Sequence, residues 1–271
     1  MLSKHILIRV HQVLAGQFGV DLLRFLHSLR GLPHFLRDWT KFRREHSGRL
    51  TLMPCLHDRY EEGGVTKNEY FWQDLLVARR IHSARPERQV DVGSRVDGFV
   101  AHVASFREIE VFDVRPVTTH VPGVVFRQSD LMDADSVRSF AGAGGYCDSL
   151  SCLHAIEHFG LGRYGDPIDP KGYERGFANM AQLLKPGGTF YLSTPIGKER
   201  VEFNANWVFD PRTIIRCAEA NGLQLQELTV VAADGVVSQV APSDKSLLEL
   251  AQSSYNLGIF VFIKTNQRIE Q

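Results

Sequence analysis

Apolar residues between residues 66 and 265 follow two different spacings, one helical and one typical of strands. Helical spacing occurs at 66–82, 100–105, 173–184, 211–222 and 244–253. Short runs rich in Val, Ile, Phe and Leu lie between these segments, at 88–100 (a run that leads into a glycine-containing turn), 108–116, 123–133, 146–155, 189–195, 223–233 and 256–265. Because predicted strands alternate with predicted helices, the pattern indicates a doubly wound α/β sheet covered by helices on both faces.

Local signals place several boundaries. Thr66 and Glu69 have the spacing of a capping box, which predicts a helix that begins there and continues to about His82. The stretch Lys185-Pro-Gly-Gly188 is predicted to end the preceding helix, since Pro and Gly disfavour helical geometry. We therefore divide the chain into a helical N-terminal extension, residues 1–65, and an α/β domain, residues 66–271.

The first 49 residues are apolar only in short bursts, and none reaches the ~18 residues of a membrane span. Arg9 interrupts the apolar core that a secretory signal needs, which favours a cytoplasmic protein. These residues include nine Lys or Arg and three Asp or Glu, which gives a net charge of +6 in a chain of net charge zero. Two interpretations stay open: a lid packed on the α/β domain, or a segment that contacts a membrane or a partner. The apolar stripe of the predicted helices contains Leu22, Leu23, Phe25, Leu26 and Leu29.

Composition narrows the class of protein. With 271 residues, 44% hydrophobic and 23% charged, the chain suits one large domain with an extension. The zero net charge gives no support for a nucleic-acid partner. The four cysteines, Cys55, Cys147, Cys152 and Cys217, form no C-x-x-C pair, which favours reduced thiols.

A series of short motifs follows the predicted strands in a fixed order. They are VDVGSRVDG, FDV, QSDLMD, LHAIEHFG and LLKPGGTFYLSTP, within residues 88–265. The series resembles the ordered motifs of class I S-adenosylmethionine-dependent methyltransferases, in a subfamily of uncharacterised members. The resemblance implies a Rossmann-like, seven-stranded sheet of order 3-2-1-4-5-7-6 with an antiparallel last strand. It also implies that S-adenosylmethionine lies across the carboxyl ends of the first strands, where ligands of open α/β sheets bind.

The turn after the first strand is the first part of the implied cofactor site. Gly93 and Ser94 supply the small residues that let a backbone approach a ligand closely. Asp91 is expected to orient the amides of this turn. The sequence departs from the family at Arg95 and Asp97, where glycines are common, and this departure puts the binding mode in question.

Two acidic residues continue the implied site. Asp113, twenty residues after Gly93, is placed to accept hydrogen bonds from the ribose hydroxyls, or else to cap a strand end. Asp130 matches the family's adenine-binding position, with an Asx turn as the alternative. Leu131 and Leu153 are implied to line the same site. A dinucleotide dehydrogenase is excluded because the G-x-G-x-x-G motif is missing.

The stretch after the fourth predicted strand reads H-x-x-E-H, with His154, Glu157 and His158. This is also the signature of inverted zinc proteases, which place it in a long helix, whereas Gly160 and Gly162 follow here. In the methyltransferase interpretation the three residues form the catalytic group, and His154 is the candidate general base because an ordinary imidazole has a pKa of ~6.5. A structural role for them is the alternative. No metal site is predicted, since His154 replaces the first Glu of the E-x-x-E-H found in metal-binding relatives.

The acceptor side rests on two loops. Tyr164 and Asp166 lie in a Gly- and Pro-rich insertion, residues 160–172, and Asn204 and Asn206 follow the fifth strand. Residues 54–64 are a candidate lid. Hydroxyl, carboxylate and amide groups predict a sugar, a glycan or another hydroxylated small molecule as acceptor, as in polysaccharide biosynthesis. The sequence thus predicts an O-methyltransferase; the alternatives are a non-catalytic or divergent methyltransferase-like domain, altered at Arg95 and Asp97, and a metal-dependent hydrolase.

Overall fold

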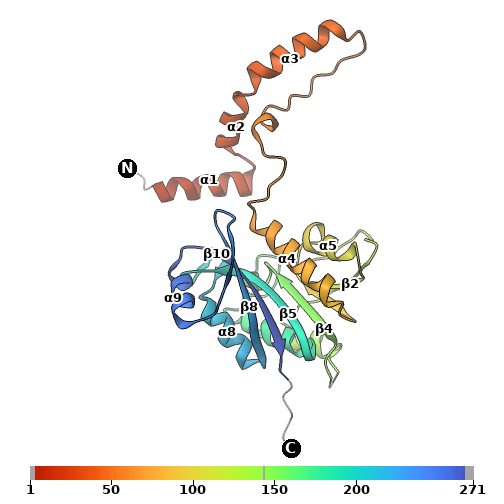
Figure 1. Ribbon diagram of the computed structural model, residues 1–271, viewed down its shortest axis with the longest axis vertical. Coiled ribbons are helices and arrows are strands. Elements are labelled where there is room, and N and C mark those ends of the chain that lie inside the picture. The colour runs from red at the N-terminus through yellow and green to blue at the C-terminus, as the bar shows by residue number, and fades with distance from the viewer. Residues whose placement is uncertain (1–3, 143, 266–271) are drawn as a thin grey trace, which may run out of the picture. The chain divides into compact units, whose positions relative to one another are not determined.

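The computed structural model describes residues 4–142 and 144–265 of the chain. The chain divides into two compact units, Met1–Val65 and Thr66–Gln271. In Figure 1 the first unit runs from red to orange, and the second from orange to blue. The described part of the first unit holds helices, and the second is an α/β domain.

The N-terminal unit contains α1 (Lys4–Phe18), α2 (Leu22–Leu29), α3 (Leu32–Glu45) and the single 3₁₀ turn η1 (Asp58–Tyr60). Asp21 caps α2, since its side chain accepts a hydrogen bond from the Arg24 amide at 2.8 Å. The chain then returns alongside these helices. Arg24 Nη2 lies 2.8 Å from His57 Nε2, and the Tyr60 hydroxyl donates to the Arg30 carbonyl at 3.2 Å.

The predicted apolar stripe of α2 faces outward in this unit. Its side chains are between 45% and 63% exposed: Leu22, Leu23, Phe25, Leu26 and Leu29. Among the described residues, no helix is long and apolar enough to cross a membrane.

The second unit is built on one eight-stranded sheet of order β3-β2-β1-β4-β5-β10-β8-β9. The strands are β1 (Gln89–Val92), β2 (Ile109–Asp113), β3 (Val124–Gln128), β4 (Cys147–Leu153), β5 (Leu184–Ile196), β8 (Leu223–Ala232), β9 (Val237–Val240) and β10 (Asn256–Lys264). The first five run parallel, and β10 is antiparallel to both β5 and β8. The predicted order 3-2-1-4-5-7-6 with an antiparallel last strand is therefore confirmed, and β9 adds an eighth strand at the edge.

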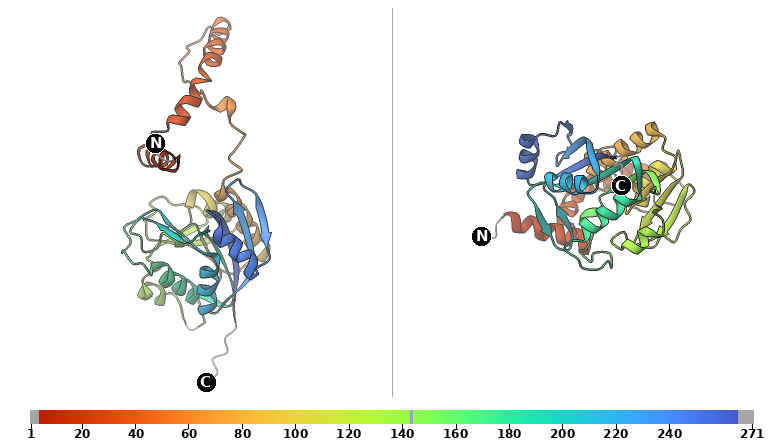
Figure 2. Two further views of the ribbon diagram at one scale, coloured as in Figure 1. Left: turned by 90° about the vertical axis from the view of Figure 1, so that its left-hand side faces the viewer. Right: turned by 90° about the horizontal axis from the view of Figure 1, so that it is seen from below.

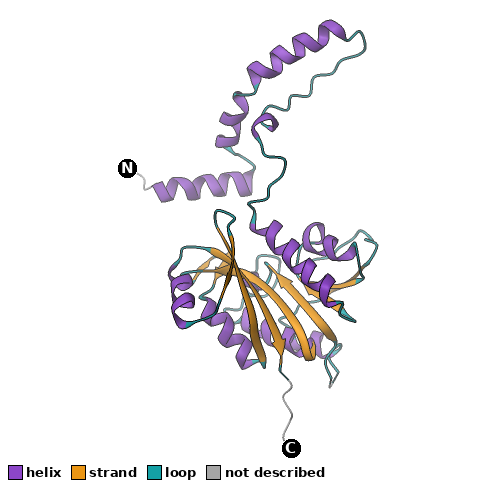
Figure 3. Cartoon of the chain, in the orientation of Figure 1, coloured by secondary structure: helices purple, strands orange, loops and turns teal. Residues whose placement is uncertain are grey.

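Helices cover both faces of the sheet (Figures 2 and 3). α4 (Glu69–Ala84), the π-helical segment η2 (Val96–Val100) and α5 (Ala101–Ala104) contribute to one hydrophobic core. α6 (Ala134–Arg138), α7 (Gly172–Leu183), α8 (Pro211–Ala220) and α9 (Asp244–Gln252) contribute to the other. β1 and β2 lie between the cores and are buried along their whole length, as parallel strands covered on two sides must be.

Several boundaries differ from the sequence prediction. α4 begins at Glu69, and the predicted capping box is wrong: Asn68 is the N-cap, and its side chain accepts from the Tyr70 amide at 2.9 Å. α7 ends at Leu183 and β5 begins at Leu184, so the Pro-Gly-Gly segment lies within the strand. β3 ends at Gln128, earlier than predicted.

Three strands carry no clear sequence signal. β9 is short and half polar, and the pair β6 (Arg200–Glu202) and β7 (Asn206–Val208) forms a small hairpin after β5. Pairing with β8 supplies the backbone partners of β9, so tertiary context decides these elements more than propensity.

Candidate functional site

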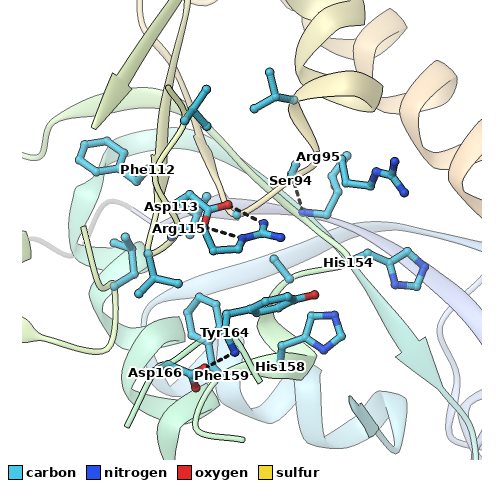
Figure 4. Close-up of a pocket in the computed structure, with 18 of the residues that line it drawn as sticks. Ser94, Arg95, Phe112, Asp113, Arg115, His154, His158, Phe159, Tyr164 and Asp166 are labelled. Carbon is cyan, nitrogen blue, oxygen red and sulfur yellow. Dashed lines mark hydrogen bonds and ion pairs between the residues drawn. The ribbon is translucent and has the colours of Figure 1, made fainter. Parts of the chain in front are cut away.

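A cavity of about 550 Å³ opens where β1, β2 and β4 end, between the loops that follow these strands. Figure 4 shows its principal side chains. The cavity brings together most of the residues predicted from the sequence: Gly93, Ser94, Asp113, Asp130, Leu131, Leu153, His154, His158, Tyr164 and Asp166. The sheet order reverses between β1 and β4, and this switch point is where ligands of open α/β sheets bind.

The turn after β1 has the tight geometry that its residues predict. Gly93 has φ of +71°, and a Cβ there would lie 2.9 Å from the side chain of Ala155. Asp91, fully buried beneath the turn, accepts from the Ser94 amide at 3.0 Å and from the Ser94 hydroxyl at 2.7 Å. The Ser151 hydroxyl donates to Asp91 at 2.7 Å. Burial raises the pKa of Asp91 to about 7, and these donors oppose that rise.

Arg95 and Asp97, which stand where glycines were expected, form an ion pair in this turn. Arg95 adopts φ of −66°, which any residue tolerates. Its guanidinium donates to both carboxylate oxygens of Asp97, at 3.0 and 2.7 Å. Both side chains are mostly exposed, at 64% and 72%, so the pair lies at the rim of the cavity that it helps to line.

Asp113 ends β2 and lines the cavity, but its carboxylate already accepts hydrogen bonds from Arg115. Arg115 donates to Asp113 from its backbone amide at 2.8 Å, from Nε at 3.0 Å and from Nη2 at 2.6 Å. The same guanidinium lies 4.4 Å from the ring centroid of Tyr164 (Figure 4). A ligand hydroxyl that approaches Asp113 must therefore share the carboxylate with Arg115 or displace it.

Asp130 forms the Asx turn that the sequence left open. Its Oδ1 accepts from the Met132 amide at 2.8 Å, and the residue also lines the cavity. Leu131 and Met132 are buried beside it and add apolar surface to this wall.

His154 lies between two carboxylates. Its Nδ1 is 2.7 Å from Glu157 Oε1, and its Nε2 is 3.4 Å from Glu69 Oε1. Its ring stacks on Tyr70 with centroids 4.5 Å apart. Although burial disfavours the charged imidazole, Glu157 and Glu69 raise the pKa of His154 to about 9. At neutral pH the ring is thus protonated and lacks the lone pair that a general base needs.

Glu157 lies behind the cavity wall and does not line it. It is fully buried, and the Thr194 hydroxyl lies 3.4 Å from its second oxygen. Burial opposes ionisation, but the His154 cation holds the pKa of Glu157 below its ordinary value. Glu157 is therefore a buried counter-ion of His154.

His158, unlike His154, is neutral near pH 7. Its Nδ1 lies 2.7 Å from the Ala205 carbonyl oxygen, which can only accept, so Nδ1 carries the proton. Burial lowers the pKa of His158 and Arg163 adds to that effect, while the Glu157 carboxylate, whose Oε1 lies 4.0 Å from His158 Nε2, opposes it. The imidazole is neutral near pH 7, with a lone pair on Nε2, and the residue lines the cavity with its ring edge-on to Tyr164. The geometry therefore favours His158 over His154 as a base.

The arrangement does not fit the zinc-protease signature. His154 precedes the three-residue helix η3 (Ile156–His158), so the motif lacks the long helix of that class. In residues 4–142 and 144–265, the only group of His, Cys, Asp or Glu close enough to hold a metal ion is His57, Asp58 and Glu61. The metal-dependent hydrolase alternative has no support at His154, Glu157 and His158.

Of the two predicted acceptor loops, only the first lines the cavity. Tyr164 lines it, and the Asp166 carboxylate accepts from the amides of Gly160, Gly162 and Tyr164, so it shapes the loop. Asn204 and Asn206 belong to the β6–β7 hairpin and do not line the cavity. The candidate lid, residues 54–64, is part of the N-terminal unit.

Sequence reasoning missed several residues of the cavity wall: Tyr70, Gln73 and Asp74 of α4, Arg115, Phe159 and Arg163. Tyr70 fits the apolar spacing of α4, whereas Gln73 and Asp74 look like solvent-facing positions of an amphipathic helix, and the structure buries them. Burial raises the pKa of Asp74 to about 6. Arg115 had a signal, since an Arg two residues after a strand-end Asp can reach back to its carboxylate.

One protein-family profile is similar to part of the chain. A family profile described as a Caenorhabditis protein of unknown function, DUF268, matches residues 124–218, about a third of the chain. No curated protein matches the sequence.

Three solved structures are similar to the chain. A 1,6-didemethyltoxoflavin-N1-methyltransferase from Burkholderia thailandensis has 12% identity and a TM-score of 0.49, and the match covers 91% of this chain and 92% of that one. An amino pentose methyltransferase from Micromonospora echinaspora has 16% identity and a TM-score of 0.47, with 81% and 100% covered. A cyclase has 12% identity and a TM-score of 0.46, with 66% and 75% covered. The strand order of the chain itself remains the basis of its fold assignment.

Proposed function

We propose that residues 66–271 bind S-adenosylmethionine in the cavity at the ends of β1, β2 and β4, and transfer its methyl group to a hydroxyl of a sugar, a glycan or another polar small molecule. One observation carries the proposal: a sheet of order 3-2-1-4-5-7-6 has a small-molecule-sized cavity at its switch point, with Gly93 in the turn after β1 and Asp113 at the end of β2.

The residues present fit such a cofactor. Asp113 would accept from the ribose hydroxyls, and Leu131 and Met132 supply an apolar wall for the adenine ring. The cofactor would supply an electrophilic methyl group on a sulfonium.

His158 would perform the proton transfer in this proposal. The acceptor oxygen would take the methyl group that the cofactor supplies, and its proton would pass to His158 Nε2. The Ala205 carbonyl holds the tautomer that leaves Nε2 unprotonated. Tyr164 beside His158 would close the acceptor side and exclude water.

A methyl-transfer assay tests this proposal. The full chain is incubated with methyl-labelled S-adenosylmethionine and a panel of hydroxylated acceptors, among them free sugars and glycan fragments. We expect label in at least one acceptor, and a loss of transfer in Asp113→Ala. Equal transfer by wild type and Asp113→Ala would contradict the assignment of the cavity.

A second candidate follows from the state of Asp113. Its carboxylate already accepts three hydrogen bonds from Arg115, so a divergent domain that binds a small molecule without transferring methyl is the alternative. Cofactor binding without transfer to any acceptor in the panel would favour this alternative.

A further inference from the structure

The N-terminal unit exposes a continuous set of large apolar side chains. We define the N-terminal apolar face by residues of α2 and α3 that are between 40% and 63% exposed: Leu22, Phe25, Leu26, Leu29, Leu32 and Leu36. The α2 members recur at the i, i+3, i+4 and i+7 spacing of one helix face. Apolar surface gathered in this way usually marks an interaction site.

The rest of the N-terminal unit packs elsewhere on these helices. Gly31 is buried at the α2–α3 junction, where a Cβ would lie 1.8 Å from the carbonyl oxygen of Leu56. Arg59 of the same returning segment donates to Asp38 at 3.0 Å. The returning segment therefore occupies another side of the helices, and the N-terminal apolar face keeps its exposure.

Cations accompany this face. Arg37, Lys41 and Arg44 lie at the i, i+4 and i+7 positions of α3, on the side next to Leu36. Asp38 is the carboxylate on this helix that takes part in ion pairs, and it is held by Arg37 and Arg59. Residues 1–49 carry a net charge of +6, so the remaining residues carry −6 in a chain of zero net charge.

We propose that the N-terminal apolar face docks on an anionic lipid surface, with α2 and α3 lying in the plane of the interface. Leucine and phenylalanine side chains would enter the boundary between headgroups and acyl chains, and Lys41 and Arg44 would contact anionic headgroups. The surface would repel the negative remainder of the chain, which makes the N-terminal unit the part in contact.

Vesicle sedimentation of the full chain tests the proposal. The vesicles are phosphatidylcholine alone, or phosphatidylcholine mixed with phosphatidylserine. We expect binding to the mixed vesicles, release by high salt, and little binding to phosphatidylcholine alone. Leu26→Glu/Leu29→Glu should lower partitioning at least ~10-fold, and Lys41→Gln/Arg44→Gln should lower it selectively on anionic vesicles.

Leu248→Glu is the matched control, because Leu248 is a 43% exposed leucine on α9 of the other unit. It should bind vesicles like the wild type. Circular dichroism checks that each variant is folded. Two results would overturn the proposal: wild type that stays in the supernatant with anionic vesicles at low salt, or a wild-type dimer in sedimentation equilibrium that Leu26→Glu/Leu29→Glu dissociates while vesicle binding is absent.

Discussion

His154 and His158 lie four residues apart, yet their surroundings give them opposite protonation states. Glu157 and Glu69 hold a proton on His154, whereas burial and the Arg163 cation keep His158 neutral. The distinction matters because only a neutral imidazole can act as a base. The sequence singled out His154 as the candidate base, and we propose His158 for that role instead.

The ion pair of His154 predicts a pH-dependent stability. The folded-state pKa of about 9 lies above the ordinary 6.5, so the stabilisation is fully present below pH 6.5 and is lost as the pH rises through 9. Urea unfolding should show the wild type losing on the order of 2 kcal/mol between pH 6.5 and 10 from this source. His154→Gln should show a much smaller loss over that range; the same loss in both proteins would assign it to other groups.

His158→Ala should lower turnover by ~10²–10⁴ and leave cofactor affinity nearly unchanged. The wild-type rate should rise with pH through a value below 6.5, since burial lowers the pKa of His158 and only the neutral ring accepts a proton. Stopped assays from pH 5 to 8 measure both effects. A stable His158→Ala protein with turnover within a few-fold of wild type would remove His158 from the reaction.

Arg115 and a ligand ribose compete for the same carboxylate in this account. Arg115→Ala should therefore tighten S-adenosylhomocysteine binding several-fold, because Asp113 no longer has to release a charge-assisted pair. Arg127→Ala is the matched control, since Arg127 pairs with Glu110 away from the cavity. Weaker binding in Arg115→Ala, with Arg127→Ala unchanged, would mean that Arg115 assists the ligand.

Among the elements, buried strands were the most predictable from sequence. β1, β2 and β4 place apolar residues at alternate or adjacent positions in short runs, and that pattern is visible in the chain. β9 was missed because its stability comes from pairing with β8. The start of α4 was misplaced because Asn68 and Thr66 are both good caps, and only the backbone geometry distinguishes them.

Part of the candidate site could also be predicted from the sequence, and part could not. The turn at Gly93 and the acid at Asp113 have motif spacing, so their meeting at one edge of the sheet could be predicted. The state of His154 could not, because Glu69 comes from a helix 85 residues earlier in the chain. Asn204 and Asn206 were placed in the site by composition alone, and they lie in a hairpin that does not line the cavity.

The turn after β1 makes a prediction that separates crowding from backbone strain. Gly93 and Gly187 have similar φ values, +71° and +77°, but of the two only Gly93 would bring an added Cβ within 4 Å of a neighbour, the side chain of Ala155. Gly187→Ala should cost about 1 kcal/mol of unfolding free energy from strain, and Gly93→Ala about 2–3 kcal/mol, with weaker cofactor binding. Urea denaturation measures both; equal costs would show that Ala155 moves aside freely.

At the scale of the whole molecule, each of the two proposed properties belongs to a different unit. All of the residues that line the cavity lie between Tyr70 and Asp166, inside the second unit. The N-terminal apolar face lies within the first unit. Ligand binding in the cavity and docking on lipid are therefore separable properties, and a variant of either unit should leave the other property intact.

Titration calorimetry of the full chain with S-adenosylhomocysteine tests the central claim most directly. We predict saturable one-to-one binding to the wild type, and binding weaker by about 1–3 kcal/mol in Asp113→Ala, because the ribose loses a charge-assisted acceptor. Absence of binding to the folded wild type, or an unchanged dissociation constant in folded Asp113→Ala, would contradict the account.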